Sequence, residues 1–521
     1  MGLRGRVSGV GLVGRAEELL EFILVDRYRT ILFFFFMGSF ARMITWFFIP
    51  VDWNGDSYVH WQIAYLSLKI GFRRFRMWDL NGLEYYWGMI PHLVEAMIMG
   101  ILGTTSILPY RVFNMLIGSF NVYLVYLVGR DLFYWKVGFF TAFFVAFFPI
   151  FTVFDIIAMQ DTLALCFLIL GFYYFRSKPL KSGIFLGLAC QSRIEYWLVS
   201  FIFIISVGLL EKPRYRFLPI LLGWLMVMVP FSIFFKIRTG NFIYPLWLNL
   251  RSALGGGLGG GSSGTLWKAF IAWILQRATR LFSDHLYFIS SLPLLYAIGL
   301  MLHLVFRPQR RYYLYSFFAS TIFINYIYVM EWVGTSLFWI VTRTLIPTLI
   351  FGFLILIKWL DSFKNNIIRL LPLIITLSIP ITNPFILPEF QRYQQCTTNA
   401  FYIADRAMTY YKGGTIICDY QTMNYRFINK WHLKPTQILS NQYNPLYYGS
   451  NNSSDFIKWF KEHNVTVWID DDWRQSKEVL NFIKQHIPQL LILKESIPYQ
   501  YLSWIDGIEI YEVNQTLLEQ T

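Results

Sequence analysis

Charged residues are scarce in this chain of 521 residues: they make up 15% of it, against roughly 25% in an ordinary soluble domain. Hydrophobic residues make up 56%. This composition excludes an ordinary soluble fold and predicts that most of the chain lies in lipid. A bilayer core of about 30 Å needs roughly 20 apolar residues per helical span, and residues 30–50, 286–306 and 337–357 meet that length. Such runs predict an all-α membrane region of about eleven spans.

Cysteine is also scarce, with four residues in the chain and no metal-ligand spacing among them. Cys166 and Cys190 fall in apolar segments, whereas Cys396 and Cys418 fall in a polar C-terminal region. If that region lies outside the cell, a disulfide is permitted there. A disulfide between Cys396 and Cys418 and two separate thiols are therefore both possible. The N-terminal region has no small-residue cleavage site, and we expect its first apolar run to be retained as a span.

Acidic residues are fewer than basic ones, which leaves a formal charge of +14. Lys and Arg fall mainly in short loops between apolar runs, which is typical of cytoplasmic loops, so topology explains the charge and nucleic acid is not an expected partner. The basic loops are residues 130–136, 176–181, 211–216, 307–311 and 358–364. Together with the basic N-terminal segment, they predict a multi-pass protein of the cell membrane with a cytoplasmic N-terminus. Residues 51–108, 154–160, 237–284, 331–336 and those after about 388 would then lie outside.

Several outer segments have a recognisable character. Residues 51–108 are moderately apolar and rich in Trp, Tyr and Met, which is typical of helices lying on the membrane surface. Residues 255–264 are a Gly-rich loop that either orders over a ligand or is a plain linker. The apolar segments on either side of Arg193 and Glu195 are short for two full crossings, which favours a bent or re-entrant pair.

The C-terminal region changes character after about residue 388. An alternating strand, TIICDY, is followed by the helical segment DFIKWFKEHN and a second strand, VTVWIDD. This order predicts a small α/β domain. The chain is therefore expected to divide into a membrane domain, residues 1–388, and an extracytoplasmic domain, residues 389–521.

Acidic residues occur at two places on the predicted outer side. Asp52 and Asp56 follow the first span, and Asp155 and Asp161 follow the third. An ionisable group at membrane depth is costly and needs a partner or a task. Capping of the following helix explains Asp161 equally well, whereas no structural network is evident for Asp56 beside Asp52 and His60. Asp56 is therefore the favoured functional carboxylate.

The order of several segments resembles the C-superfamily of membrane glycosyltransferases, the GT-C fold, whose members use polyprenyl-phosphate sugar donors. The matching segments are WNGDSYVHW, GMIPHLVEAMIMGILG, YRVFNMLIGSFNVYLVYLVGRDLF, AFFPIFTVFDIIAMQDTLALCFLILGFYYF and GIFLGLACQSRIEYW. Further on, VTRTLIPTLIFG is similar to the Arg-x-x-x-Pro helix start of the protein-mannosyltransferase and aminoarabinose-transferase branch. No segment is diagnostic alone, but together they cover most of the membrane region.

The resemblance implies roles for particular residues. Asp56 takes the place of the catalytic carboxylate, which deprotonates an acceptor hydroxyl as general base. Asp155 or Asp161 matches a second acidic position that orients the acceptor or holds a divalent cation, Mg²⁺ or Mn²⁺. Arg343 would bind the donor phosphate through charge-assisted hydrogen bonds, with Arg193 as the second choice.

Four further residues are candidates for the same site: Asp52, Glu84, His92 and Glu195. Glu84 and His92 flank a segment in which the aminoarabinose branch has a Lys-Pro-Pro run, and this chain has WGMIP instead. That departure leaves the donor sugar open. His92, like His60, is also explained as an interfacial or core histidine, and Arg343 as a cation that extends to lipid headgroups.

The predicted function is transfer of a sugar from a polyprenyl-phosphate or dolichyl-phosphate donor to a glycan, lipid or protein at the outer face, by a single inverting displacement. An oligosaccharyltransferase would carry Trp-Trp-Asp-Tyr-Gly in its C-terminal domain, and residues 468–473 read WIDDDW instead. A transporter would have two repeated halves with midplane charges, and no such repeat is found. A catalytically silent protein that binds glycan or lipid stays open as an alternative.

Overall fold

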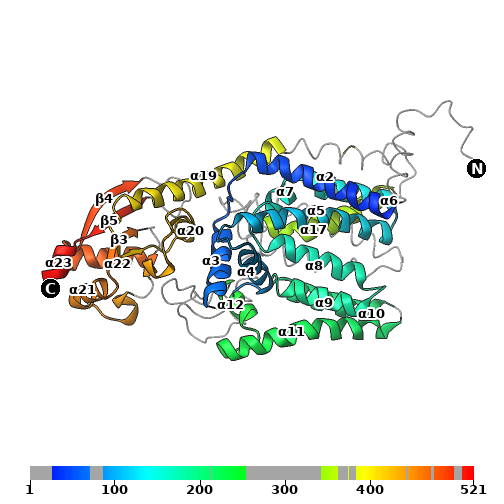
Figure 1. Ribbon diagram of the computed structural model, residues 1–521. Coiled ribbons are helices and arrows are strands. Elements are labelled where there is room, and N and C mark those ends of the chain that lie inside the picture. Colours follow the sequence, from blue (N-terminus) through cyan, green and yellow to red (C-terminus); the bar gives the residue numbers. More distant parts are fainter. Residues whose placement is uncertain are drawn as a thin grey trace, which may run out of the picture.

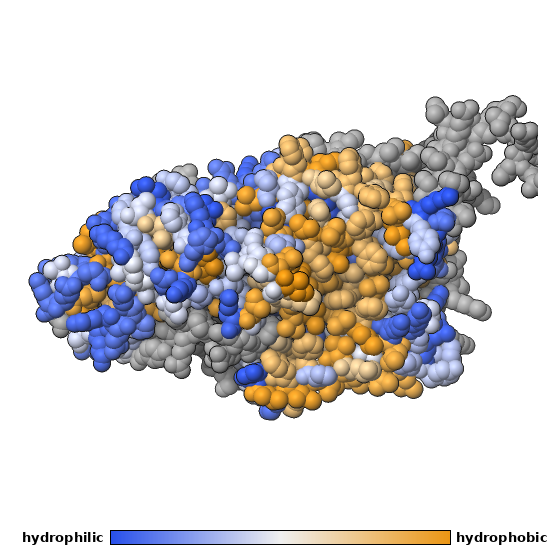
Figure 2. Space-filling view, viewed as in Figure 1, coloured by the Kyte–Doolittle hydropathy of each residue, from blue (hydrophilic) through white to orange (hydrophobic). Residues whose placement is uncertain are grey.

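The computed structural model describes residues 26–70, 86–211, 213–253, 342–361, 374, 383–441, 444–470, 474–497 and 507–520. Glu84, the Gly-rich loop 255–264 and the apolar run 286–306 lie outside these residues. Figure 1 shows a bundle of roughly parallel helices with a smaller, sheet-containing part at one end. The bundle surface is mostly hydrophobic and the sheet-containing part mostly hydrophilic (Figure 2). The chain is therefore a multi-pass membrane protein with a polar part at one end of its bundle.

The bundle is built from helices whose sequences are mostly apolar. They are α2 (Arg27–Phe48), α5 (Leu108–Leu132), α6 (Trp135–Phe147), α7 (Pro149–Asp155), α8 (Asp161–Tyr174), α9 (Pro179–Cys190), α10 (Tyr196–Leu210), α11 (Phe217–Thr239), α12 (Tyr244–Ala253) and α17 (Ile346–Asp361). Among the described residues, α2, α5 and α11 are long and apolar enough to cross a membrane, and α6 and α7 reach that length only together, as a pair bent by 60°. The remaining predicted spans rest on shorter helices or on residues outside the described ranges.

Small residues let the bundle helices approach closely. A Cβ atom on Gly183 of α9 would lie 1.9 Å from the carbonyl oxygen of Ile220 on α11, so no larger residue fits there. In lipid, where apolar surface gives little drive for association, such backbone proximity is what holds helices together. This packing aligns the helices and brings their connecting loops to two opposite ends.

Residues 130–136, 176–181 and 358–361, which belong to loops predicted to be cytoplasmic, lie at the end of the bundle away from the sheet (Figure 1). The Tyr134 hydroxyl donates a hydrogen bond to Asp361, and the Lys358 ammonium lies 5.0 Å from the centre of the Tyr134 ring. Arg176 forms an ion pair with Glu211 at 3.2 Å. The loops that carry the acidic candidates lie at the opposite end, next to the sheet-containing part (Figure 1).

Two helices of the segment 51–108 run across that end of the bundle: α3 (Gly55–Ile70) and α4 (Ile90–Leu102) (Figure 1). Helix α4 exposes Leu93, Met97 and Ile101, an apolar face that agrees with a surface helix. Helix α3 differs from that expectation. Its Tyr58 and Trp61 are buried, because α3 is enclosed between α4 and the sheet-containing part.

The sheet-containing part opens with the long helix α19 (Asn383–Met408) and has a five-stranded sheet in the order β2-β1-β3-β5-β4. Its strands are β1 (Thr415–Ile417), β2 (Ile438–Leu439), β3 (Val465–Asp470), β4 (Leu491–Ile497) and β5 (Ile508–Val513). Strand β1 pairs in parallel with β2 and β3, and β5 pairs antiparallel with β3 and β4. The accompanying helices are α20 (Gln421–Asn429), α21 (Ser453–Glu462), α22 (Arg474–His486) and α23 (Gln515–Gln520).

The segments TIICDY, DFIKWFKEHN and VTVWIDD correspond to β1, α21 and β3, as their patterns predict. The open question about the cysteines is also answered. Cys396 and Cys418 are both buried and neither forms a disulfide, and the same holds for Cys166 and Cys190.

Helix α20 packs directly on α3 through aromatic rings. The centre of the Tyr425 ring lies 4.9 Å from that of Trp61 and 5.1 Å from that of Tyr58. Beside them, the Thr105 hydroxyl donates a hydrogen bond to the Asn429 side chain at 2.8 Å. Edge-on aromatic pairs stabilise a contact beyond the area they bury, so α3 is held from both sides.

A pH-dependent contribution to stability is expected at Asp419, after β1. Burial raises its pKa to about 6, although Ser440 and Asn441 donate hydrogen bonds to its carboxylate. Unfolded Asp has a pKa of about 3.9, so between about pH 4 and pH 6 the folded state holds a proton that the unfolded state has lost. The free energy of unfolding therefore falls as pH rises through this range, by about 2 to 3 kcal/mol in total. Above pH 6 the whole of this loss in stability is present.

The substitution Asp419→Asn should remove this dependence. The full-length protein in detergent would be melted at pH 4.5 and pH 7, with the exposed Asp455→Asn as the control. We expect Asp419→Asn to be the more stable protein at pH 7 and to lose that advantage at pH 4.5. An equal difference at both pH values would contradict the assignment.

Candidate active site

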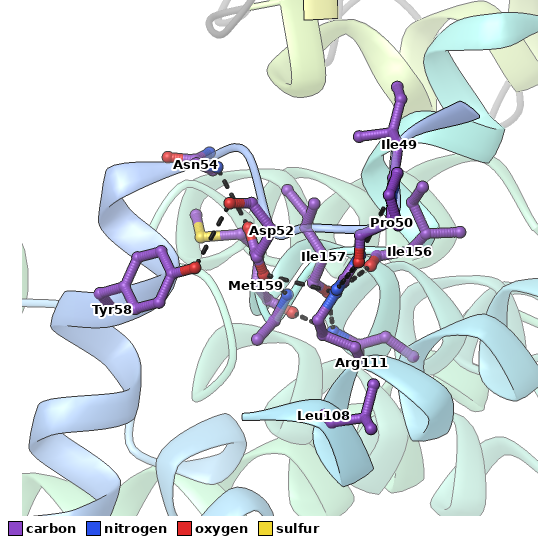
Figure 3. A network of polar contacts seen from close by, with 12 residues as sticks. Ile49, Pro50, Asp52, Asn54, Tyr58, Leu108, Arg111, Ile156, Ile157 and Met159 are labelled. Carbon is purple, nitrogen blue, oxygen red and sulfur yellow. Dashed lines mark hydrogen bonds and ion pairs between the residues drawn. The ribbon is translucent and has the colours of Figure 1, made fainter. Parts of the chain in front are cut away.

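Arg111 of α5 holds two loops together at the end of the bundle next to the sheet-containing part (Figure 3). Its guanidinium donates hydrogen bonds to the carbonyl oxygens of Pro50 at 2.6 Å and Ile156 at 2.9 Å. It also lies 4.1 Å from the centre of the Trp46 ring, where a cation is attracted to the aromatic face. One side chain therefore ties the loop that follows α2 to the loop that follows α7.

Asp52 belongs to this same network. Its carboxylate accepts hydrogen bonds from the backbone N–H of Ala158 at 2.8 Å and of Asn54 at 3.1 Å, and lies 3.9 Å from Arg111. Burial raises the pKa of Asp52, while Arg111 and these N–H groups act in the opposite direction. Its contacts are those of a residue that shapes the loop before α3.

Asp155 lies inside the bundle and pairs with Arg42 of α2. The Arg42 Nε donates to the Asp155 carboxylate at 3.0 Å, and the Thr162 hydroxyl donates to its other oxygen at 2.7 Å. Both charged side chains are buried. The pair connects α2 to the junction of α7 and α8, immediately beside Asp161.

Asp56 and Arg343 form an ion pair across the chain. Arg343 Nη2 lies 3.0 Å from Asp56 Oδ2, although the two residues are 287 positions apart. The Asp56 carboxylate is 41% exposed and the Arg343 side chain 10%. The other terminal nitrogen of Arg343, Nη1, is buried and has no hydrogen-bond partner in the described part of the chain. The pair thus combines an accessible carboxylate with a guanidinium that has an unused donor.

Local structure places both residues. The backbone N–H of Asp56 donates to the Asn54 side chain at 3.0 Å, which starts α3 and puts Asp56 in its first turn. Arg343 lies in a short 3-10 segment, Thr342–Leu345, that leads directly into α17. Pro347 occupies the first turn of α17, where a proline is well tolerated because its missing N–H has no helical partner there.

A second charged group forms at the short connection between α9 and α10. Arg193 pairs with Glu195 at 2.7 Å and also with Asp161 at the start of α8. Burial opposes the charge on Glu195, but Arg193 and Arg343 outweigh it and lower the pKa of Glu195. Because the charge of Arg343 acts on Glu195, the Arg193 group and the Asp56–Arg343 pair are within electrostatic range of each other.

Helix α4 is fixed against this connection by a close backbone approach. A Cβ atom on Gly88 would lie 2.0 Å from the carbonyl oxygen of Gln191, and the backbone N–H of Ile90 donates to that oxygen at 3.0 Å. His92, in the first turn of α4, is fully buried, and its Nε2 lies 2.6 Å from Nδ1 of His60. The site is therefore enclosed by α3, α4, the start of α8, the α9–α10 connection and the segment before α17.

The described carboxylates do not suit a resident Mg²⁺ or Mn²⁺. Within the described ranges, no three side chains of the types His, Cys, Asp and Glu lie close enough together to hold a metal ion. Asp155 and Asp161, the two residues considered as ligands, each face a guanidinium. A cation at either carboxylate would have to displace an arginine, and hard cations take several oxygen ligands.

The sequence patterns did not identify three residues at this end of the bundle: Arg42, Arg111 and Asn114. Asn114 donates from its amide to the carbonyl oxygens of Ile157 at 2.7 Å and Met159 at 2.8 Å. Each of the three is a strongly polar residue inside a span, α2 or α5. The cost of such residues in lipid is a signal that could have identified them.

No family model matches the sequence, and no curated protein is a significant match. Fifteen chains of solved structures match in fold. ArnT from Cupriavidus metallidurans in the apo state aligns with a TM-score of 0.51 and 11% identity over 91% of this chain and 97% of its own. The apo oligosaccharyltransferase from Archaeoglobus fulgidus aligns with 0.50 and 11% over 91% and 74%. At this identity the likeness is one of fold, and both neighbours are membrane glycosyltransferases with the GT-C fold. The chain therefore has the GT-C fold, as the order of its segments predicts.

Proposed function

We propose that this protein is a membrane glycosyltransferase that moves a sugar from a polyprenyl-phosphate or dolichyl-phosphate donor to a hydroxyl group of a glycan, lipid or protein. The observation that carries the proposal is the ion pair of Asp56 and Arg343, 3.0 Å long, beside the Arg193 group at one end of a GT-C bundle. Such a transfer requires a base that deprotonates the acceptor hydroxyl and cations that stabilise the phosphate leaving group of the lipid donor.

In this mechanism the ion pair opens when the donor binds. The donor phosphate takes the unused Nη1 of Arg343 and then competes for Nη2, which leaves the Asp56 carboxylate free. Asp56 accepts the proton of the acceptor hydroxyl while the oxygen of that hydroxyl attacks the anomeric carbon of the donor sugar. The bond from that carbon to the phosphate oxygen breaks, and its electron pair leaves with the phosphate. A single displacement of this kind inverts the anomeric centre.

Arg193 is the second cation in reach of the phosphate. Glu195 and Asp161 hold its guanidinium from two sides, which fixes its direction before the donor arrives. Asp161 is our choice for the second acidic position, because it belongs to this group, whereas Asp155 is engaged with Arg42 inside the bundle. Asp161 then acts through Arg193, because it holds this cation in place for the donor phosphate.

The same proposal assigns the two ends of the bundle. The basic loops would face the cytoplasm, and the site and residues 389–521 would face outside. The polyprenyl tail would stay in lipid along the hydrophobic surface seen in Figure 2. Turnover by the purified protein in nanodiscs, given labelled polyprenyl-phosphate mannose and polyprenyl-phosphate aminoarabinose, tests the function as a whole. Binding of these lipids without turnover would indicate a catalytically silent protein instead.

Replacing Arg343 should weaken use of the donor more than use of the acceptor. A hydrogen bond to a charged group contributes about 1.5 to 3 kcal/mol, so Arg343→Ala should lower kcat/KM for the donor by about 10 to 100-fold, and Arg343→Lys by less because one cationic donor is kept. Initial rates at varied donor and varied acceptor separate the two substrates. Arg392→Ala is the control, since Arg392 is an exposed arginine of α19. Equal losses for donor and acceptor would argue against a phosphate contact.

A further inference from the structure

Two buried histidines beside Asp56 have no task in this mechanism. His60 lies one helical turn after Asp56 on α3, so the two side chains share a face. His60 is 2% exposed and His92 is fully buried, and 2.6 Å separates Nδ1 of His60 from Nε2 of His92. A hydrogen bond between two imidazoles places one proton between the rings and leaves the outer nitrogen of each ring for another partner.

The outer nitrogen of His60 is Nε2, and it is an unused polar atom inside the site. It is buried and has no hydrogen-bond partner among the residues that the structure describes. The Gln160 side chain lies beside the same ring as a weak hydrogen-bond partner, and this contact raises the pKa of His60. Its own Oε1 is buried as well and makes no well-formed hydrogen bond within the described ranges. A buried polar atom whose hydrogen bonds are not satisfied lowers the stability of the fold. This points to a ligand that forms hydrogen bonds with both His60 Nε2 and Gln160 Oε1.

The surroundings of His60 identify the chemical class of that ligand. Burial, the neighbouring His92, and the cations Arg343 and Arg193 all lower the pKa of His60 well below its usual value, so the ring is neutral. A neutral ring nitrogen forms a hydrogen bond but has no charge to offer a phosphate, whereas the two guanidinium groups do. A hydroxyl group both donates and accepts, so it can satisfy the ring nitrogen and the Gln160 amide together.

We propose that His60, held in orientation by His92, is a positioning residue of this site and that its Nε2 binds a hydroxyl group together with Gln160. The proposal rests on the proposed glycosyl transfer. The hydroxyl belongs either to the transferred sugar or to the acceptor, and both offer the same chemistry. Phosphate recognition is thereby separated from hydroxyl recognition. The arginines bind the charged phosphate leaving group, and His60 fixes the orientation of the uncharged group that carries the hydroxyl.

Two substitutions at His60 separate the roles of its two nitrogens. The amide of His60→Asn reaches the position of Nδ1, so it keeps the contact with His92 and loses the hydroxyl. The longer His60→Gln reaches the position of Nε2 and keeps the hydroxyl, and His92→Gln keeps the support for His60. We expect His60→Asn to weaken hydroxyl binding about tenfold and the two Gln variants to stay within about threefold of wild type. His486→Asn, at an exposed histidine of α22, is the matched control.

The assay uses the full-length protein in nanodiscs and two lipid probes, polyprenyl phosphate and polyprenyl-phosphate mannose, with dissociation constants and transfer rates measured for each variant. If His60→Asn weakens only the sugar-bearing lipid, the hydroxyl is on the donor sugar. If both lipids bind as before and the KM for the acceptor rises, the hydroxyl is on the acceptor. Equal weakening of both lipids, or no change in binding and transfer, overturns the proposal.

Failure of the proposed function is visible separately. A wild-type protein without turnover removes the glycosyltransferase assignment, whereas a wild-type protein with normal turnover and an indifferent His60→Asn variant removes only the role of His60. Rescue by His60→Gln excludes a merely structural effect, because that variant disturbs the bond to His92 more than His60→Asn does.

Discussion

Asp56→Asn should lower the rate of sugar transfer by a factor of about 10² to 10⁴, the range that a general base contributes. Asn has the size of Asp and cannot accept the acceptor proton. It also releases Arg343 from its ion pair, so donor affinity should be unchanged or higher. The measurement compares single-turnover transfer and donor binding for wild type and variant in nanodiscs. A fall in rate without a loss of donor affinity distinguishes a missing base from a damaged site.

The control for this experiment is Asp131→Asn. Asp131 is a half-exposed carboxylate that also pairs with an arginine, Arg130, but it lies in the basic loop at the opposite end of the bundle. Its replacement should leave both transfer and binding as they are. If Asp56→Asn transfers sugar as fast as wild type, Asp56 is not the base.

The second large effect concerns stability. Removing one member of a buried ion pair leaves the other charge unpaired and costs about 3 to 5 kcal/mol, whereas removing both can be nearly neutral. Arg42 and Asp155 form such a pair, with side-chain exposures of 0% and 7%. We therefore expect Arg42→Met and Asp155→Leu each to lower the melting temperature strongly and the double variant to recover most of the loss. Thermal unfolding in detergent, followed by loss of the monodisperse chromatographic peak, measures this.

The double variant also separates folding from catalysis. Because the Asp155 carboxylate accepts from Thr162, beside Asp161, its loss should loosen the start of α8. A double variant that is stable and still transfers sugar would assign Asp155 a purely structural role. A double variant no more stable than either single variant would show that the ion pair does not account for the stability.

Local patterns were sufficient for the membrane class and for part of the secondary structure, and the resemblance of several segments was sufficient for the fold. Membrane class follows from the length of apolar runs, and the strands and helix of the C-terminal region follow from short periodic patterns; both are properties of contiguous residues. The segment order predicted the GT-C fold. The same resemblance marked Asp56 and Arg343, which the structure brings within 3.0 Å of each other. Their roles in transfer stay predictions until the substitutions are made.

The sequence by itself determined that this chain enters a membrane, where its basic loops gather, and which carboxylates stand at the ends of its spans. Only the tertiary structure decided the partner of each carboxylate: Arg111 for Asp52, Arg42 for Asp155, Arg193 for Asp161 and Arg343 for Asp56. It also enclosed α3 and joined His60 to His92. The physical reason is distance along the chain. These contacts join residues up to 287 positions apart, and helix packing selects among several arginines of similar local character.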